Sequence, residues 1–119
     1  MQLRRSGRLA EYGALLYLQL HGLHRIARNY TTRLGEIDLV MLDRRRHTLV
    51  FVEVRYRRNI EYGTPAETVT HAKRTRIRQA AKHFTKSHRI YRFSSIRFDV
   101  VSISRPNYRP HIHWIRNAF

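Results

Sequence analysis

Two short apolar runs lie near the middle of the chain, at residues 36–43 and 48–55. Both are rich in Ile, Leu, Val and Phe, and four polar residues separate them. This pattern predicts two β-strands joined by a four-residue turn, an antiparallel hairpin. One face would carry Ile37, Leu39, Val50, Val52 and Val54, and the other Val40, Leu42, Leu49 and Phe51. Because both faces are apolar, we expect the hairpin to lie inside a sheet that is covered on both sides.

Helical periodicity predicts one helix before the hairpin and one after it. The first covers residues 8–21 and is followed by Gly22, a residue type common just after the last helical turn. Its predicted buried stripe consists of Leu9, Leu16 and Leu20, with Tyr12 and Leu15 beside them. The second covers residues 67–87, and its predicted buried stripe consists of Ile77, Ala80, Ala81 and Phe84.

The remaining segments complete a small domain. Residues 23–29 and 96–103 are predicted strands, residues 1–7 form a basic arm, and residues 105–119 form a tail with two prolines. The tail ends in Trp114, Ile115 and Phe119, so we expect it to dock on the domain. The order helix, strand, hairpin, helix, strand predicts a single α/β domain over residues 1–119. Its small mixed β-sheet would have a helix on each side.

The hairpin register brings acidic side chains together. If Asp43 pairs with Thr48, paired residue numbers sum to 91. Asp38 then lies opposite Glu53, and Glu36 lies opposite Arg55. Side chains alternate along a strand, so all four project from the same face.

Two opposed carboxylates need a compensating charge. At about 5 Å and an effective dielectric near 20, Asp38 and Glu53 would repel by roughly 3 kcal/mol. A divalent cation between them would turn that cost into binding energy, and Mg²⁺ is held in this way by one or two carboxylates. The alternative is that Glu36 and Arg55 form an ion pair while Asp38 and Glu53 point into solvent or lie out of register.

The composition indicates a polyanionic partner. The 119 residues carry a formal net charge of +16, with 21 Arg, 3 Lys and 8 acidic residues. Clustered arginines replace counterions on a phosphate backbone and grip phosphate with two N–H groups, so nucleic acid is the leading partner. The chain has no run of transmembrane length, and its first apolar stretch is broken by Glu11, Gln19 and His21, so it is a poor match to a secretory signal. We therefore expect a cytoplasmic protein without a membrane partner.

Basic residues near the carboxylates are the candidates for nucleic-acid contact. These are Arg57, Arg58, Lys73, Arg74 and Arg76. The turn residues 44–46 are simplest as solvated arginines, with a distal phosphate contact as the alternative. Asp99 lies two residues from Arg97, and a structural pairing with an arginine is favoured over a catalytic role.

Several motifs together resemble a known family. The most specific are GEIDL at 35–39, FVEVR at 51–55 and RFDVV at 97–101. They are accompanied by Gly7, Ala10-Glu11, Gly22, Arg28-Asn29, Lys73, Ala80-Ala81, Trp114-Ile115 and Ala118-Phe119. Asp38 followed by Glu53-Val54-Arg55 on the next strand resembles the pattern of the PD-(D/E)XK nuclease superfamily, and the full set of motifs covers almost the whole chain. Within this superfamily, the chain is most similar to the YraN family of small predicted endonucleases, distant relatives of Holliday junction resolvases.

The resemblance implies a restriction-endonuclease-like fold and a set of roles. Asp38 and Glu53 would be catalytic carboxylates that bind Mg²⁺ or Mn²⁺, and Glu11 would join the metal site. In that mechanism the metal polarises the scissile phosphate and activates water. Arg55 stands where the superfamily has lysine, and arginine does not lose its proton in proteins. Arg55 would therefore stabilise charge on the phosphate, with Glu36 supporting it.

The function that follows is hydrolysis of phosphodiesters in DNA, including branched or structured DNA, with DNA favoured over RNA. One alternative is a nucleic-acid-binding protein that kept the nuclease fold and lost its chemistry. Another is a basic adaptor protein whose contact with polyanions is incidental. The sequence leaves the substrate structure open, and it does not distinguish a monomer from a homodimer.

Overall fold

The computed structural model describes residues 2–57, 69–89, 93, 95–104 and 111–119, with side chains from Arg8 onward. A mixed five-stranded sheet has the order β1-β2-β3-β4-β5. β3 and β4 are parallel, and the other neighbouring strands are antiparallel. The elements are α1 (Gln2–Leu20), β1 (His24–Thr31), β2 (Glu36–Asp43), β3 (Thr48–Arg57), α2 (His71–Ser87), β4 (Ser95–Ser104) and β5 (His111–Ile115).

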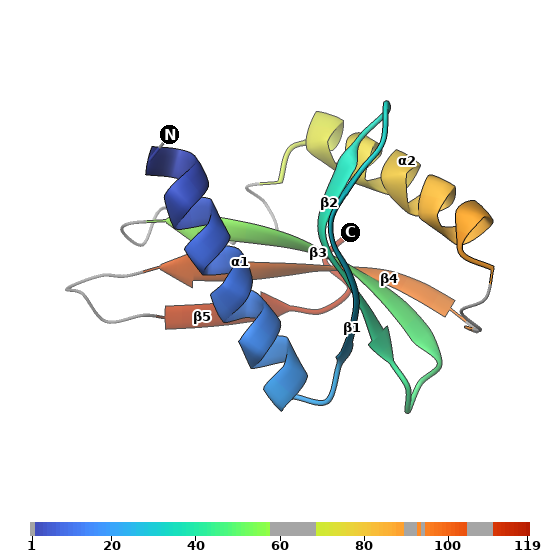
Figure 1. The fold of residues 1–119 in the computed structure, drawn as a ribbon, viewed down its shortest axis with the longest axis horizontal. Helices are drawn as coiled ribbons and strands as arrows, with labels where there is room; N and C mark the ends of the chain where they lie inside the picture. Colours follow the sequence, from blue (N-terminus) through green and yellow to red (C-terminus); the bar gives the residue numbers. More distant parts are fainter. Residues whose placement is uncertain (1, 58–68, 90–92, 94, 105–110) are drawn as a thin grey trace.

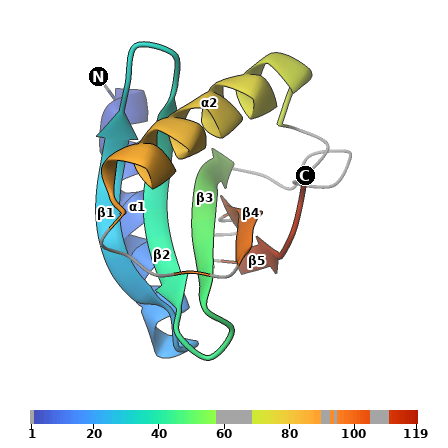
Figure 2. The same cartoon turned by 90° about the vertical axis from the view of Figure 1, so that its right-hand side faces the viewer.

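One helix covers each face of the sheet. Figure 1 shows α1 crossing in front of the strands, and Figure 2 shows α2 lying across the opposite face. This is the predicted α/β domain of restriction-endonuclease-like type, with the hairpin of β2 and β3 inside the sheet. Among the described residues, no helix is long and apolar enough to cross a membrane.

Each helix packs on its own apolar cluster. Ile77, Ala80, Ala81 and Phe84 of α2 are buried, as the periodicity predicts. They pack with Val40, Leu49 and Phe51 from the hairpin. On the other face, α1 packs on Leu39, Met41, Val50 and Val52. The hairpin is therefore covered on both sides, as expected.

The predicted buried stripe of α1 is largely wrong. Leu9, Leu16 and Leu20 are 68%, 61% and 85% exposed, and Tyr12 is also exposed. Of the predicted residues only Leu15 is buried, together with Ala10, Ala14 and Leu18. The helix carries two apolar stripes, and the one with alanines faces the strands because small side chains let the helix backbone approach the sheet closely.

The two ends of the chain also differ from the expectation. Helix α1 begins at Gln2, so most of the expected basic arm belongs to the helix. This agrees with the good helix propensity of Gln, Leu and Arg. The C-terminal tail docks as expected, but it does so as a strand, β5, on the edge of β4. Phe119 then stacks on Phe98 with ring centroids 5.2 Å apart.

Local signals mark the ends of the helices, although α2 begins at His71 and not at residue 67 as predicted. Gly22 has a φ of +93°, which glycine adopts without a Cβ penalty, and it ends α1. Thr70 precedes α2, and its side chain accepts a hydrogen bond from the Lys73 backbone N–H at 3.2 Å. This cap fixes the first turn of α2, which carries Lys73.

Candidate active site

The site forms where β2 and β3 separate. The ladder between them runs from Asp43–Thr48 to Leu39–Val52, in the predicted register. The predicted next pair, Asp38 and Glu53, lies beyond this ladder. There the Asp38 side chain takes the place of a backbone acceptor, because its Oδ2 accepts a hydrogen bond from the Val54 N–H at 2.8 Å.

The regular alternation of β2 is broken at Asp38. Ile37 and Leu39 would share a face in a regular strand, yet Ile37 packs in the α2 cluster and Leu39 in the α1 cluster. On β1, Asn29 lies between the pairs Arg28–Leu39 and Tyr30–Ile37 and has a φ of +50°. The prediction that Ile37 shares the face of Leu39 is therefore wrong. At this irregularity Asp38 interacts electrostatically with a residue of each helix, Glu11 of α1 and Lys73 of α2.

Asp38 and Glu53 meet nonetheless, and their carboxyl groups share a hydrogen bond. Glu53 is only 5% exposed, and burial raises its pKa to about 8, with the Asp38 charge adding to the rise. Burial also raises the pKa of Asp38. The interaction between the two carboxyl groups raises the pKa of Glu53 and lowers that of Asp38, which favours the proton on Glu53. The expected repulsion is thus relieved by a proton.

Glu11 approaches this pair from α1. Burial raises the pKa of Glu11, and the charge of Asp38 raises it further. Its Oε1 is buried and has no hydrogen-bond partner in the described part of the chain. No three His, Cys, Asp or Glu side chains there are close enough to form a metal site. Glu11 is thus within electrostatic reach of Asp38 without completing a three-carboxylate group.

Lys73 reaches the pair from α2, on the other side of the sheet. Its Nζ lies 3.8 Å from Oε2 of Glu53, and its side chain is 32% exposed. The charges of Lys73 and, less strongly, Arg55 lower the pKa of Glu53, but burial outweighs both. The predicted cross-strand position of Glu36 opposite Arg55 falls beyond the β2–β3 ladder. Glu36 is exposed, and its charge raises the pKa of Asp38.

The candidate nucleic-acid contacts divide into three groups. Arg57, at the end of β3, is half-buried, and Arg76 is exposed on α2. Arg74 has a packing role, because its Nε donates to the Val69 carbonyl at 2.9 Å and its guanidinium lies 5.3 Å from the Phe119 ring centroid. Arg58 lies outside the described residues.

Sequence reasoning missed the residues of β1 and α1 beside Glu11. Asn29 hydrogen-bonds to the Glu11 carboxyl. This bond and the charge of Arg28 both lower the pKa of Glu11. Arg28 lies 4.2 Å from the Tyr12 ring centroid, and a hydrogen bond from it lowers the pKa of Tyr12. The signal was the Arg28-Asn29 pair itself, which appeared among the family motifs without a role. Asn is also among the non-glycine residues that most readily adopt positive φ.

The site therefore combines a proton-sharing carboxyl pair with nearby fixed cations. Carboxylate oxygens suit a hard divalent cation. The Lys73 ammonium and the guanidiniums of Arg28 and Arg55 suit the oxygens of a phosphate group. The elements come from both faces of the sheet and meet where β2 and β3 part.

Known proteins are similar in sequence to this chain over nearly its full length. The model of the uncharacterised protein family UPF0102 matches residues 10–103. A UPF0102 protein of Stutzerimonas stutzeri is 46% identical over 114 residues, covering 96% of this chain and 93% of the relative. One from Nitrosococcus oceani is 44% identical over 116 residues, covering 98% and 92%. One from Bifidobacterium longum is 43% identical over 117 residues, covering 98% and 94%. The chain therefore belongs to the UPF0102 family, which is the YraN family that its motifs resemble.

Proposed function

We propose that this protein is a metal-dependent endonuclease-like protein that hydrolyses phosphodiesters in DNA, including branched or structured DNA. One observation carries the proposal. The half-buried Asp38 and the buried Glu53 form a carboxyl pair in which burial raises both pKa values, with the Lys73 ammonium 3.8 Å from Glu53. A proton-sharing carboxyl pair beside fixed cations is a costly arrangement for a purely structural hairpin. The net charge of +16 favours a nucleic acid as the substrate.

The donor set fits Mg²⁺ or Mn²⁺. Asp38 and Glu53 would hold the ion, and Glu11, whose Oε1 has no hydrogen-bond partner among the described residues, lies within electrostatic reach of Asp38. Hard cations of this kind take carboxylate oxygens and complete their shell with water and phosphate. When bound, the ion supplies polarisation of the phosphate and a more acidic water. Glu53 has to release its proton for this, since its pKa is about 8 in the protein without metal.

The chain itself supplies fixed positive charge. Arg55 keeps its proton, so it can orient phosphate oxygens and stabilise charge but cannot accept a proton. Lys73 contributes an ammonium from α2 at the Glu53 side of the pair. Arg55 lies on a strand and Lys73 on a helix, and the two cations would hold a phosphate group between them.

A second candidate function is nucleic-acid binding without hydrolysis. The observation that favours it is Arg55 at the lysine position of the superfamily motif. In this case the carboxyl pair would be an inherited scaffold, and the basic residues would contact the DNA backbone. We favour DNA over RNA as the partner in both functions.

A cleavage assay separates the two candidates. Purified protein is incubated with linear, nicked, flapped and four-way DNA in the presence of Mg²⁺ or Mn²⁺, beside the Asp38→Asn variant. The enzyme function predicts metal-dependent cleavage that Asp38→Asn abolishes. The binding function predicts no cleavage with any metal, and unchanged or tighter DNA binding by Asp38→Asn, because a negative charge is removed.

A further inference from the structure

A basic pocket lies at the other end of the β2–β3 hairpin from the carboxyl pair. Its volume is about 440 Å³, and it is lined by the end of α1, the hairpin turn, β4 and the end of β5. Four arginines line it, Arg45, Arg46, Arg97 and Arg116, together with Trp114. In the part of the chain that the structure describes, Asp43 is the one acidic residue that lines it.

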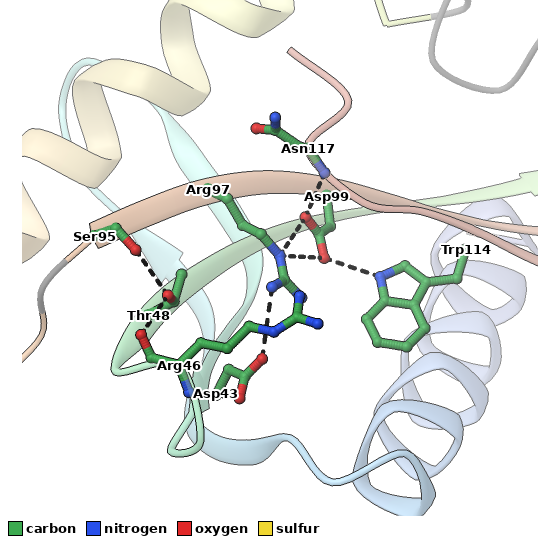
Figure 3. Close-up of polar contacts among 8 residues, drawn as sticks. All are labelled: Asp43, Arg46, Thr48, Ser95, Arg97, Asp99, Trp114 and Asn117. Carbon is green, nitrogen blue, oxygen red and sulfur yellow. Dashed lines mark hydrogen bonds and ion pairs between the residues drawn. The ribbon is translucent and has the colours of Figure 1, made fainter.

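A buried carboxylate, that of Asp99, fixes two of the side chains that line the pocket, Arg97 and Trp114. Asp99 is fully buried, and its two oxygens accept hydrogen bonds from Arg97 Nε at 3.1 and 3.2 Å. Trp114 Nε1 and the Asn117 backbone N–H also donate to Asp99, each at 2.9 Å. Figure 3 shows these groups converging on Asp99. The pairing of Asp99 with an arginine is as expected, and it fixes Arg97 and Trp114 at the pocket.

The positive charge of the pocket exceeds its negative charge. The carboxylate of Asp99 forms an ion pair with the guanidinium of Arg97. Oδ2 of Asp43 lies 3.6 Å from Arg97 Nη1. Figure 3 shows the Arg46 side chain reaching from the hairpin turn to lie beside Arg97 and Asp43, toward Trp114. Arg116 lies over the Trp114 ring at 3.9 Å from its centroid. Among the described residues, four arginines face two carboxylates, so these groups leave the pocket with an excess of two positive charges before a ligand is added.

Gathered guanidiniums match one class of ligand. Like charges in a partly enclosed pocket repel one another, and an anion among them relieves that repulsion. Guanidiniums present paired N–H groups that match phosphate oxygens. The pocket has room for a phosphate group with part of its sugar, since small-ligand sites start at about 300 Å³.

We propose that this pocket holds a backbone phosphate of the bound nucleic acid, at a distance from the carboxyl pair. The inference rests on the proposed nucleic-acid binding and gives that function a second contact. Asp38 and Asp43 are five residues apart on β2, which corresponds to about 17 Å along the strand. Backbone phosphates recur about every 3.4 Å of rise along one strand of a duplex. One DNA molecule can therefore reach both ends of the hairpin.

The only tryptophan of the chain, Trp114, lines the pocket and makes it observable. We would titrate the full chain with a short DNA duplex and record Trp114 fluorescence and the salt dependence of binding. The test variant is Arg45→Gln with Arg116→Gln. The control is Arg33→Gln with Arg44→Gln, which removes the same charge at exposed positions outside this pocket. Arg44 and Arg45 are neighbours in the same turn, so the comparison is closely matched.

We expect duplex binding to change Trp114 fluorescence in the wild type and in the control. The test variant should lose that change, and its log–log salt slope should fall by about two units. Equal slopes and equal fluorescence changes in the test and control variants would overturn the proposed phosphate contact in the pocket, while DNA binding itself would stand. DNA binding with no change at Trp114 in the wild type would do the same. Absence of DNA binding altogether would overturn both this inference and the proposed function.

The source of the phosphate is tested in the same experiment. Inorganic phosphate and a mononucleotide are titrated in parallel, together with duplexes that end in 5′-phosphate or 5′-hydroxyl groups. A backbone contact predicts the same Trp114 response with both duplexes and only weak responses to the small anions. Saturation of Trp114 by a mononucleotide at concentrations where the duplex has no effect would assign the pocket to a free nucleotide and overturn the proposal.

Discussion

The backbone N–H of Val54 donates a hydrogen bond to Oδ2 of Asp38 at 2.8 Å, across the gap where β2 and β3 stop pairing. This bond fixes the Asp38 carboxylate without using the proton of Glu53. It also lowers the pKa of Asp38 against the larger effect of burial. Asp38 is therefore held as the acceptor of the pair, and Glu53 is left as the group that gains or loses a proton. The first two predictions follow from this division.

The stability of the protein should fall as the pH rises through the range in which Glu53 titrates. Its pKa moves from 4.5 in the unfolded chain to about 8 in the folded one. Between these values the folded state binds the proton more tightly, so the free energy of unfolding decreases with rising pH, by up to about 5 kcal/mol in total. Glu53→Gln keeps a hydrogen-bond donor and should flatten this dependence. Denaturant unfolding at pH 5, 6.5 and 8 measures it.

The control for that experiment is Glu36→Gln, which removes an exposed carboxylate from the same end of β2. Its unfolding free energy should keep a wild-type dependence on pH. If Glu53→Gln has the same pH dependence as the wild type over this range, Glu53 does not carry the proton.

Metal binding should stabilise the protein, and more strongly at high pH. Mg²⁺ or Mn²⁺ at millimolar concentration should raise the thermal midpoint, because ligands that bind only the folded state stabilise it. The rise should be larger at pH 8 than at pH 6, since Glu53 must lose its proton to become a ligand. Asp38→Asn should abolish the response, because it removes one of the two carboxylate ligands. Calorimetry that finds no metal-induced shift at pH 8 would count heavily against the enzyme function.

The meeting of Asp38 and Glu53 could be predicted because it depends on two local rules. A four-residue turn fixes the register, and alternation then places the two acids together. The end of the ladder could not be predicted, since it depends on a side chain, Asp38, competing with the backbone for the Val54 N–H. The switch of Ile37 to the α2 cluster follows from the same irregularity.

Periodicity also identified α1 without identifying its buried face. Two apolar stripes run along this helix, one of leucines and one with Ala10, Ala14 and Leu18. Hydrophobicity alone favours the leucines, whereas the distance between helix and sheet favours the alanines. That distance is a property of the folded domain, and no pattern within the helix contains it. The docking of Trp114 was predictable from its size, but the strand that carries it was masked by the histidines at 111 and 113.

The contact between Gly35 and α2 should not tolerate a side chain. A Cβ at Gly35 would lie 1.9 Å from the Arg76 carbonyl oxygen, which belongs to the helix backbone. Gly35→Ala should therefore destabilise the protein by about 3 kcal/mol, because either the turn or α2 has to move. The matched control is Gly13→Ala in α1, where the Cβ would lie 3.6 Å from Ile103 Cδ1, an ordinary contact. That change should stabilise by up to about 1 kcal/mol. Thermal unfolding of both variants measures the contrast.

If the protein cleaves DNA, substitutions at Arg55 and Lys73 should show whether these residues stabilise charge or transfer a proton. Arg55 cannot give up its proton, so Arg55→Lys should keep substantial cleavage, and its pH–rate profile should match that of the wild type. Arg55→Ala should lose roughly 10²–10³-fold, as expected when one preorganised charge is removed. Lys73→Ala should also slow cleavage, whereas Lys82→Ala, on the exposed side of α2, should not. Cleavage by Arg55→Ala at the wild-type rate would remove Arg55 from the mechanism and leave Lys73 as the cation that holds the phosphate.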